Sequence, residues 1–304
     1  MKRKPIKRIL CPIDFSDFSA RAYEYAASLA QRYDAKLFVQ HVVERWRYPC
    51  ADFATTFDQY DSFCKNLYRL GEQRLREFVR ARGREGWCPD CVTHEGIADE
   101  CILSFAQQED VDLIVIGTHG IRGADRIVLG SVTETVLRKA RCPVLAVHDE
   151  PRKPLAVPHA AREIELHEIL CCIDFSEQSK DGLEYALSLA NEYSATLTLA
   201  HILEGWTIGG NHGDGVAEAE RMLDSLIPVQ PVQECRIEKA VRPGSPYKEI
   251  CKLAYERDAD LIVMGGQGRN SMDDRVFGST TYRVVQLSGC PVLAIHPYKE
   301  PPAG

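Results

Sequence analysis

The chain has 304 residues, of which 45% are hydrophobic and 27% are charged, and its formal net charge is −7. This composition is typical of a folded globular protein, and the negative charge argues against binding to nucleic acid or to an anionic membrane. No apolar run approaches the roughly 20 residues of a membrane span, and the run at 9–13 is too short for a secretory signal, so we expect a cytoplasmic protein. The 12 cysteines are then expected to be reduced thiols rather than a disulfide framework.

Strand-like and helix-like segments alternate along the first half of the chain. The apolar run 8–13 predicts a strand, after which Ser16 or Asp17 can cap a helix whose apolar positions recur from Ala20 to Tyr33. Further strands are predicted at 36–43, 91–95, 113–116 and 143–147, and further helices at 56–84 (with Gly71 as a candidate break), 99–108 and 131–140.

An internal repeat decides the domain organisation. Residues 9–44 (ILCPIDFSDFSARAYEYAASLAQRYDAKLFVQHVVE) align without a gap with residues 169–204 (ILCCIDFSEQSKDGLEYALSLANEYSATLTLAHILE), and about half of the positions are identical. A second pair, 112–148 and 260–296, begins DLIVIGTHG and DLIVMGGQG and ends CPVLAVH and CPVLAIH. The second copy repeats the order of elements with a shorter second helix, around 216–226. We therefore predict one duplicated domain, at 1–148 and 168–304, with a linker at 149–167.

The alternation of strands and helices indicates the fold class. We expect an α/β fold in which each repeat forms a doubly wound, five-stranded, mainly parallel sheet with helices on both faces. The segment 113–116 is apolar throughout, as in a parallel strand that is covered on both faces. Ligands of such sheets bind beyond the carboxyl ends of the strands, where the strand order reverses. Residues at these ends are therefore the candidate site residues.

Three features fall at these ends in each copy. The first strand is followed by an acid, Asp14 or Asp174, and the second strand closes on a histidine and an apolar residue, His41-Val42 or His201-Ile202. A glycine-rich segment with the spacing G-x2-G-x9-G-S follows the fourth strand, at Gly117, Gly120, Gly130 and Ser131 and at Gly265, Gly268, Gly278 and Ser279. Glycines let the backbone approach a ligand, and the last Gly-Ser opens a helix whose amides favour an anion such as phosphate. A tight turn alone would also use such glycines, but recurrence in both copies favours a phosphate loop.

These residues resemble the universal stress protein family in its tandem two-domain form. The resemblance rests on the acid after the first strand, the G-x2-G-x9-G-[ST] segment, which is typical of the ATP-binding branch of that family, and the CPVL strand near the end of each repeat. It implies ATP, with or without Mg²⁺, as the ligand. It also implies antiparallel pairing of the strands 143–147 and 291–295 in an intramolecular pseudo-dimer, and two such chains could associate as a homodimer.

The resemblance also assigns binding positions. Asp14 and Val42 would face adenine and ribose in the first copy, as would Asp174 and Ile202 in the second. The other implied positions are Pro12, Ile116, Gly117, Gly120, Gly130, Ser131 and Val132, and in the second copy Met264, Gly265, Gly268, Gly278, Ser279 and Thr280. The second copy departs from the first at Cys172 in place of Pro12, at Thr280 in place of Val132 and at Gly266 in place of Thr118. We therefore expect the first copy to be the tighter site.

The sequence leaves three functions open. The leading hypothesis is a nucleotide-binding regulatory or stress-response protein with little or no catalysis, because the chain lacks the G-x4-G-K-[ST] segment of Walker-type ATPases. A slow ATPase or nucleotide-transferring enzyme is the second, since His119, Arg122, Asp125 and Arg126 lie in the first glycine-rich segment and could assist hydrolysis, although solvated loop residues are the simpler interpretation. An interaction module with structural glycine loops is the third.

Cys88 and Cys91 form a C-x2-C pair, which can be half of a zinc site or a redox pair. Cys50 and Cys64 could complete a zinc site only if the helix predicted at 56–84 broke sharply. On a straight helix, Cys64 and Cys88 would be roughly 35 Å apart at 1.5 Å per residue. We therefore expect ordinary thiols here, and a flexible linker in the glycine-rich run 205–215.

Overall fold

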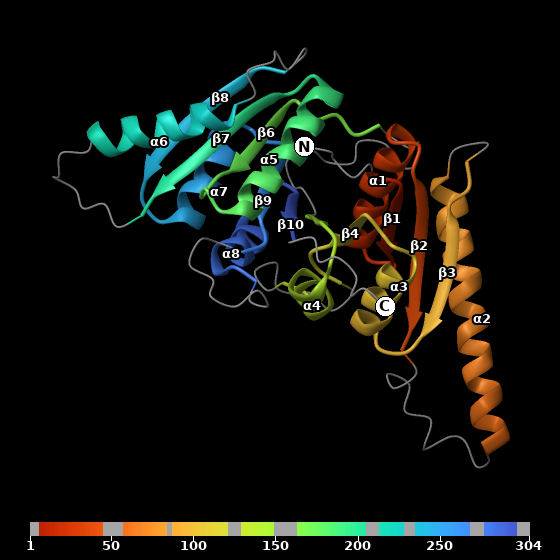
Figure 1. The fold of residues 1–304 in the computed structure, drawn as a ribbon. Helices are drawn as coiled ribbons and strands as arrows, with labels where there is room; N and C mark the ends of the chain where they lie inside the picture. Colours follow the sequence, from red (N-terminus) through yellow and green to blue (C-terminus); the bar gives the residue numbers. More distant parts are fainter. Residues whose placement is uncertain are drawn as a thin grey trace, which may run out of the picture. The chain divides into compact units, whose positions relative to one another are not determined.

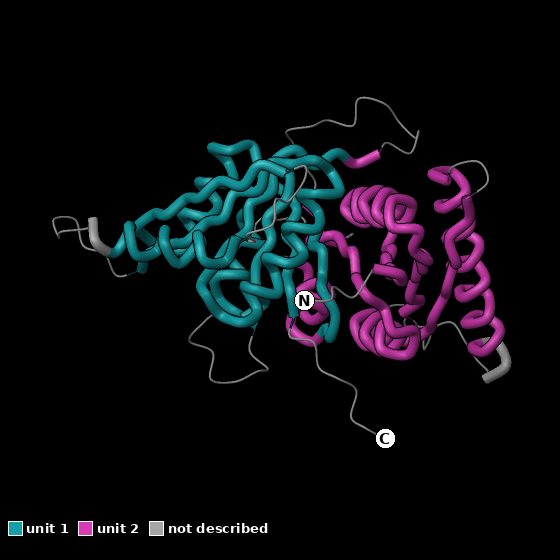
Figure 2. The backbone as a smooth tube through the Cα atoms, turned by 45° about the horizontal axis from the view of Figure 1, so that its top comes forward, with its two compact units in different colours: residues 1–3, 140–146, 165–304 teal, residues 4–139, 147–164 magenta. Residues whose placement is uncertain are grey.

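The computed structural model describes residues 6–44, 57–83, 87–120, 129–148, 163–204, 213–227, 235–267 and 277–296. The chain divides into two compact units, which Figure 2 shows in different colours. Unit 1 comprises residues 1–3, 140–146 and 165–304, and unit 2 comprises residues 4–139 and 147–164. Each repeat thus forms most of one unit.

Unit 2 contains four parallel strands in the order β3-β2-β1-β4 (Figure 1). Its elements along the chain are β1 (Arg8–Pro12), α1 (Asp17–Arg32), β2 (Lys36–Val43), α2 (Phe57–Arg82), β3 (Asp90–Glu95), α3 (Ala98–Gln108), β4 (Leu113–Gly117) and α4 (Ser131–Lys139). The chain runs outward from β1 to β3 and then crosses to the other side of β1, so the strand order reverses between β1 and β4. Right-handed crossovers place α1 and α2 on one face of this sheet and α3 on the other.

Unit 1 repeats this arrangement and adds the last strand of repeat one. Its elements are β6 (Glu168–Cys172), α5 (Glu177–Tyr193), β7 (Thr196–Leu203), α6 (Gly213–Leu226), β8 (Ile237–Pro243), α7 (Pro246–Glu256), β9 (Leu261–Gly265), α8 (Ser279–Leu287) and β10 (Val292–Ile295). The strand order is β10-β9-β6-β7-β8, and all of these pairs are parallel. The order reverses between β6 and β9, which matches the position of β1 and β4 in unit 2.

Strand β5 (Val144–Val147) pairs with β10 inside unit 1. The pairing is antiparallel, with Leu145 opposite Leu293, and this is the strand pairing that the family resemblance implies. Because β5 and β10 pair with each other, the edges by which they face each other are not open. The pseudo-dimer as a whole and a further homodimer stay predictions.

The predicted α/β, doubly wound fold is confirmed. The helix caps and the burial of the strands agree with the sequence pattern. Ser16 caps α1 by accepting a hydrogen bond from the Ser19 amide at 3.2 Å, and Ser176 caps α5 in the same way through Ser179. The central strands are buried on both faces, since β4 is buried at all five positions. No helix within the described ranges is long and apolar enough to cross a bilayer.

The predicted break at Gly71 is wrong, because α2 is one uninterrupted helix of 26 residues (Figure 1). A Cβ at Gly71 would lie 2.8 Å from Cγ2 of Val43 and 3.2 Å from Cδ2 of His41. The glycine therefore allows α2 to pack closely against the end of β2. No bend brings Cys64 toward Cys88, and none of the cysteines in the described part of the chain forms a disulfide. Cys50 lies outside the described residues.

A larger residue at Gly71 should destabilise unit 2. We expect Gly71→Val to lower its free energy of unfolding by about 2 kcal/mol, because overpacking of a closely packed contact costs about 1–3 kcal/mol. Urea unfolding of the full chain measures the effect. Gly289→Val is the control, since a Cβ at Gly289 meets no atom within 4 Å. Equal stability of the two variants would contradict this account of Gly71.

Candidate functional site

The candidate site of repeat one lies where the strand order reverses, beyond the carboxyl ends of β1 and β4. Asp14 follows β1, and the segment 117–120 leaves the end of β4. The structure brings the two together, because a Cβ on Gly120 would lie 2.6 Å from Oδ2 of Asp14. Any larger residue at Gly120 would therefore displace the carboxylate or the segment. The parallel topology alone predicts this meeting of Asp14 and Gly120.

A tight turn fixes the carboxylate of Asp14. Its Oδ1 accepts hydrogen bonds from the amide and the hydroxyl of Ser16, at 3.0 and 2.6 Å. In repeat two, Oδ1 of Asp174 accepts the same two bonds from Ser176, at 3.0 and 2.5 Å. One carboxylate oxygen thus holds the start of the following helix, and the other oxygen of Asp14 faces the glycine-rich segment.

Three hydrogen bonds anchor the glycine-rich segment of repeat one. The Thr118 amide donates to the carbonyl of Val147 at 3.0 Å, and the Gly130 amide donates to the carbonyl of Thr118 at 2.9 Å. The hydroxyl of Thr133 in α4 donates to the carbonyl of Gly117 at 2.7 Å. These bonds fix the N-terminus of α4 beside the end of β4.

Repeat two contains the same anchors. The Gly266 amide donates to the carbonyl of Ile295 and the Gly278 amide to the carbonyl of Gly266, both at 2.7 Å. The hydroxyl of Thr281 donates to the carbonyl of Gly265 at 2.8 Å. Gly268 lies outside the described residues, as do Arg122, Asp125 and Arg126 of the first copy.

These bonds refine the roles of the last glycines. The amides of Gly130 and Gly278 are used inside the segment, so the amides available to an anion are those of the first helical turn. In repeat one this turn holds the exposed Ser131 and the half-buried Val132, and in repeat two it holds Ser279 and Thr280. The glycines shape the turn, and the residues that follow them face outward.

The remaining predicted site residues differ in exposure. Val42 and Ile202 are half-buried at the ends of β2 and β7. Pro12, Ile116 and Met264 are buried in the strands, as is Cys172, so their side chains belong to the hydrophobic core at the base of the sites.

Sequence reasoning missed one group of contacts, which is present in both repeats. Phe15 and Phe175 follow the site aspartates in a left-handed backbone conformation, and their rings lie 4.5 and 4.7 Å from the rings of His41 and His201. The signal was present, because both copies contain Asp-Phe-Ser and a histidine in the same register. Strand periodicity places the histidines at the strand ends, but it does not predict their contacts with the turn.

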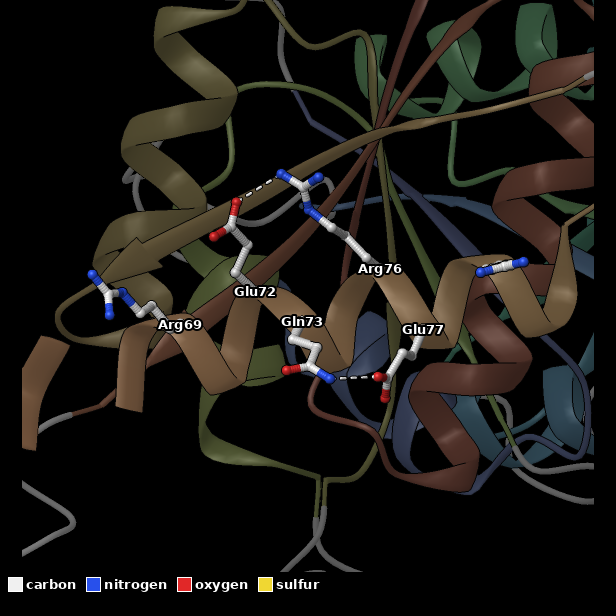
Figure 3. A pocket seen from close by; sticks show the side chains of 6 residues that line it. Arg69, Glu72, Gln73, Arg76 and Glu77 are labelled. Atoms are coloured by element: carbon white, nitrogen blue, oxygen red, sulfur yellow. Dashed lines mark hydrogen bonds and ion pairs between the residues drawn. The ribbon is translucent and has the colours of Figure 1, made fainter. Parts of the chain in front are cut away.

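A surface hollow of about 280 Å³ lies elsewhere, on the solvent face of α2 (Figure 3). Its walls come from one helix, and two of its pairs bond to each other, Arg76 to Glu72 and Gln73 to Glu77, both at 2.8 Å. The lining residues are Arg69, Glu72, Gln73, Arg76, Glu77 and Arg80. Because these charges are mixed and all six lining residues belong to one helix, we take the glycine-rich site as the candidate site.

Comparison with known proteins supports the interpretation of the repeats. The model of the universal stress protein family matches residues 5–148 and 165–296, which is most of the chain. The chain belongs to the universal stress protein family. A universal stress protein of Methanocaldococcus jannaschii is 32% identical over 147 residues, which are 48% of this chain and 84% of the relative. One of Bacillus subtilis is 30% identical over 145 residues, which cover 42% of this chain and 98% of the relative.

A solved structure extends the likeness to both repeats. The crystal structure of a universal stress protein from Archaeoglobus fulgidus has a TM-score of 0.63 and covers 95% of this chain and 98% of its own. Its sequence identity is 20%, so it establishes the fold alone. This member of the universal stress protein family therefore has a tandem architecture in common with a solved relative.

Proposed function

We propose that this universal stress protein binds adenine nucleotides, ATP first among them, at the strand-order reversal of each repeat. It acts in the cytoplasm as a regulatory or stress-response protein with little or no catalysis. The proposal treats 1–148 and 168–304 as two ligand-binding domains joined by the segment 149–167. ATP binds with or without Mg²⁺.

The observation that carries the proposal is the anchored glycine-rich segment, which recurs with the same hydrogen bonds in both repeats. In each, a threonine of the first helical turn and a glycine amide tie the end of the fourth strand to a helix N-terminus. Helix N-termini with free amides favour phosphate groups. In repeat one, Asp14 lies against this segment, where a carboxylate can accept hydrogen bonds from ribose hydroxyls or from the amino group of adenine.

The same geometry supports binding more than turnover. Oδ1 of Asp14 accepts hydrogen bonds from the amide and the hydroxyl of Ser16, and Oδ2 lies on the side of Gly120, so the carboxylate is held in place as a hydrogen-bond acceptor. His119 lies buried in the segment, with its Nδ1 at 3.0 Å from the hydroxyl of Thr118 and its ring against Phe18. A buried ring in these contacts is a packing element rather than an exposed general base.

Purified protein should carry or bind ATP without sustained hydrolysis. We expect mass spectrometry of the denatured protein to find adenine nucleotide, and calorimetry with ATP to find up to two sites per chain. Turnover should stay below about 1 per second, the low end for dedicated enzymes. Sustained faster hydrolysis would support the slow-ATPase alternative. Absence of nucleotide and of binding heat would support an interaction module with structural glycine loops.

A further inference from the structure

The two site aspartates are each followed by a residue in an unfavourable backbone conformation. Phe15 has φ 67° and Phe175 has φ 64°. Residues that carry a Cβ are disfavoured in this left-handed region, and a bulky one persists there only where its surroundings hold it. The same left-handed conformation occurs at the same register in both repeats. This recurrence indicates a common structural feature next to the ligand-binding acid.

A histidine from the neighbouring strand holds this turn in each repeat. Nδ1 of His41 donates to the carbonyl of Ile13 at 2.8 Å, and Nδ1 of His201 donates to the carbonyl of Ile173 at 2.6 Å. The carbonyl belongs to the peptide unit that enters the aspartate, so the hydrogen bond fixes the orientation of that peptide directly. The imidazole ring also packs against the left-handed phenylalanine on the other side of the turn.

The environment of His41 keeps this hydrogen bond in place. Burial lowers the pKa of His41, with the hydrogen bond to Ile13 opposing this and the charge of Arg74 adding to it, so the ring is neutral at pH 7. The carboxylates of Asp14 and Glu44 act in the opposite direction. Because the carbonyl of Ile13 can only accept, the single ring proton lies on Nδ1. Gly71 of α2 closes the far side of the ring.

We propose that His41 and His201 are positioning residues for the ligand, each acting through its Nδ1 hydrogen bond to the peptide unit before the site aspartate. This bond and the serine bonds to the carboxylate hold the turn from its two sides. In repeat one they keep Asp14 against Gly120, where it meets the ligand. The inference rests on the proposed function, because its consequence is measured as nucleotide affinity.

The test separates the hydrogen bond from the packing of the ring. His41→Phe keeps an aromatic ring and removes the N–H, whereas His41→Asn removes the ring and can place an amide N–H at the position of Nδ1. In calorimetry with ATP on the full chain, His41→Phe should weaken one class of sites about fivefold, as expected for one neutral hydrogen bond, and His41→Asn should stay within about twofold of the wild type. The matched pair at His201 should affect the other class.

Repeat two is the internal control for variants of repeat one. A wild-type chain that binds no ATP would contradict the proposed function itself. Binding by the wild type with unchanged affinity in His41→Phe and His201→Phe would overturn the positioning role alone. Equal loss in the Phe and Asn variants would also overturn it, because the ring and its packing, rather than the N–H, would then be responsible. Thermal unfolding of each variant shows whether lost affinity follows lost stability, and affinity restored by Asn at an unchanged midpoint supports positioning.

Discussion

Replacing Gly117 by alanine should lower the free energy of unfolding of unit 2 by about 3 kcal/mol, the upper end for overpacking. A Cβ at this position would lie 2.8 Å from the carbonyl carbon and 2.9 Å from the carbonyl oxygen of Phe18. Both atoms belong to the backbone of the first turn of α1, which cannot rotate away as a side chain can. The whole start of the helix would have to move off β4.

Gly265 in repeat two offers a matched comparison. A Cβ there would lie 3.2 Å from the Cβ of Gln178 and 3.2 Å from the carbonyl of Gln267, which is tight but leaves room for a small shift. We therefore expect Gly265→Ala to cost about 1 kcal/mol. Urea unfolding of both variants measures the difference. If Gly265→Ala cost as much as Gly117→Ala, close approach of α1 to β4 would not explain the glycine at 117.

Gly117 and Gly120 show where sequence reasoning reached its limit. Their spacing predicted a turn at the carboxyl end of the fourth strand, and the structure has that turn. The spacing could not separate a glycine that a ligand needs from one that a neighbouring helix needs, because both restrict a Cβ. Gly117 packs against α1, whereas Gly120 faces Asp14. The packing of the folded chain distinguishes the two.

Most of the secondary structure was predictable, because local signals and tertiary packing agree. The boundaries of β2 are those expected, and the helix cap is Ser16, one of the two predicted candidates. The prediction of a helix break at Gly71 was wrong for a physical reason. Glycine costs helix stability in isolation, but here packing against β2 offsets that cost, so the helix continues.

The turn at Phe15 was beyond prediction from composition or periodicity. A phenylalanine gives no local signal for a left-handed conformation. Here the ring of His41, which is distant in sequence, packs against Phe15, and the carboxylate of Asp14 holds the amide of the following Ser16. Arg74 and Phe78 of α2 also contact the ring of Phe15. The side chains that support the aspartate come from the turn after β1, from β2 and from α2. No single segment of the sequence therefore predicts them.

Placing a branched side chain at the last glycine of the motif should abolish tight binding of ATP in repeat one. A Cβ at Gly130 would lie 3.3 Å from the carbonyl of Thr118, which accepts the Gly130 amide, and 3.6 Å from Cα of His119. The methyl groups of Gly130→Val would push the segment 118–120 away from the N-terminus of α4. We expect a loss of affinity of at least tenfold, which corresponds to about 1.4 kcal/mol.

The paired variant Gly278→Val should remove the weaker class of sites. Repeat two has Gly266 where repeat one has Thr118, and an additional glycine costs about 0.5–1 kcal/mol when it must be ordered, or about a two- to fivefold difference in affinity. Hydrogen bonds from Gly266 to Ile295 and from Gly278 to Gly266 already order this backbone, so we expect a difference near twofold. Calorimetry with ATP on both variants, with Gly289→Val as the control for substitution alone, measures the ranking. If Gly278→Val removed the tighter class of ATP sites, the ranking of the two repeats would be inverted. Unchanged binding in both variants would contradict the phosphate-loop interpretation, because the glycine-rich segments could then be displaced from the helix N-termini without affecting the ligand.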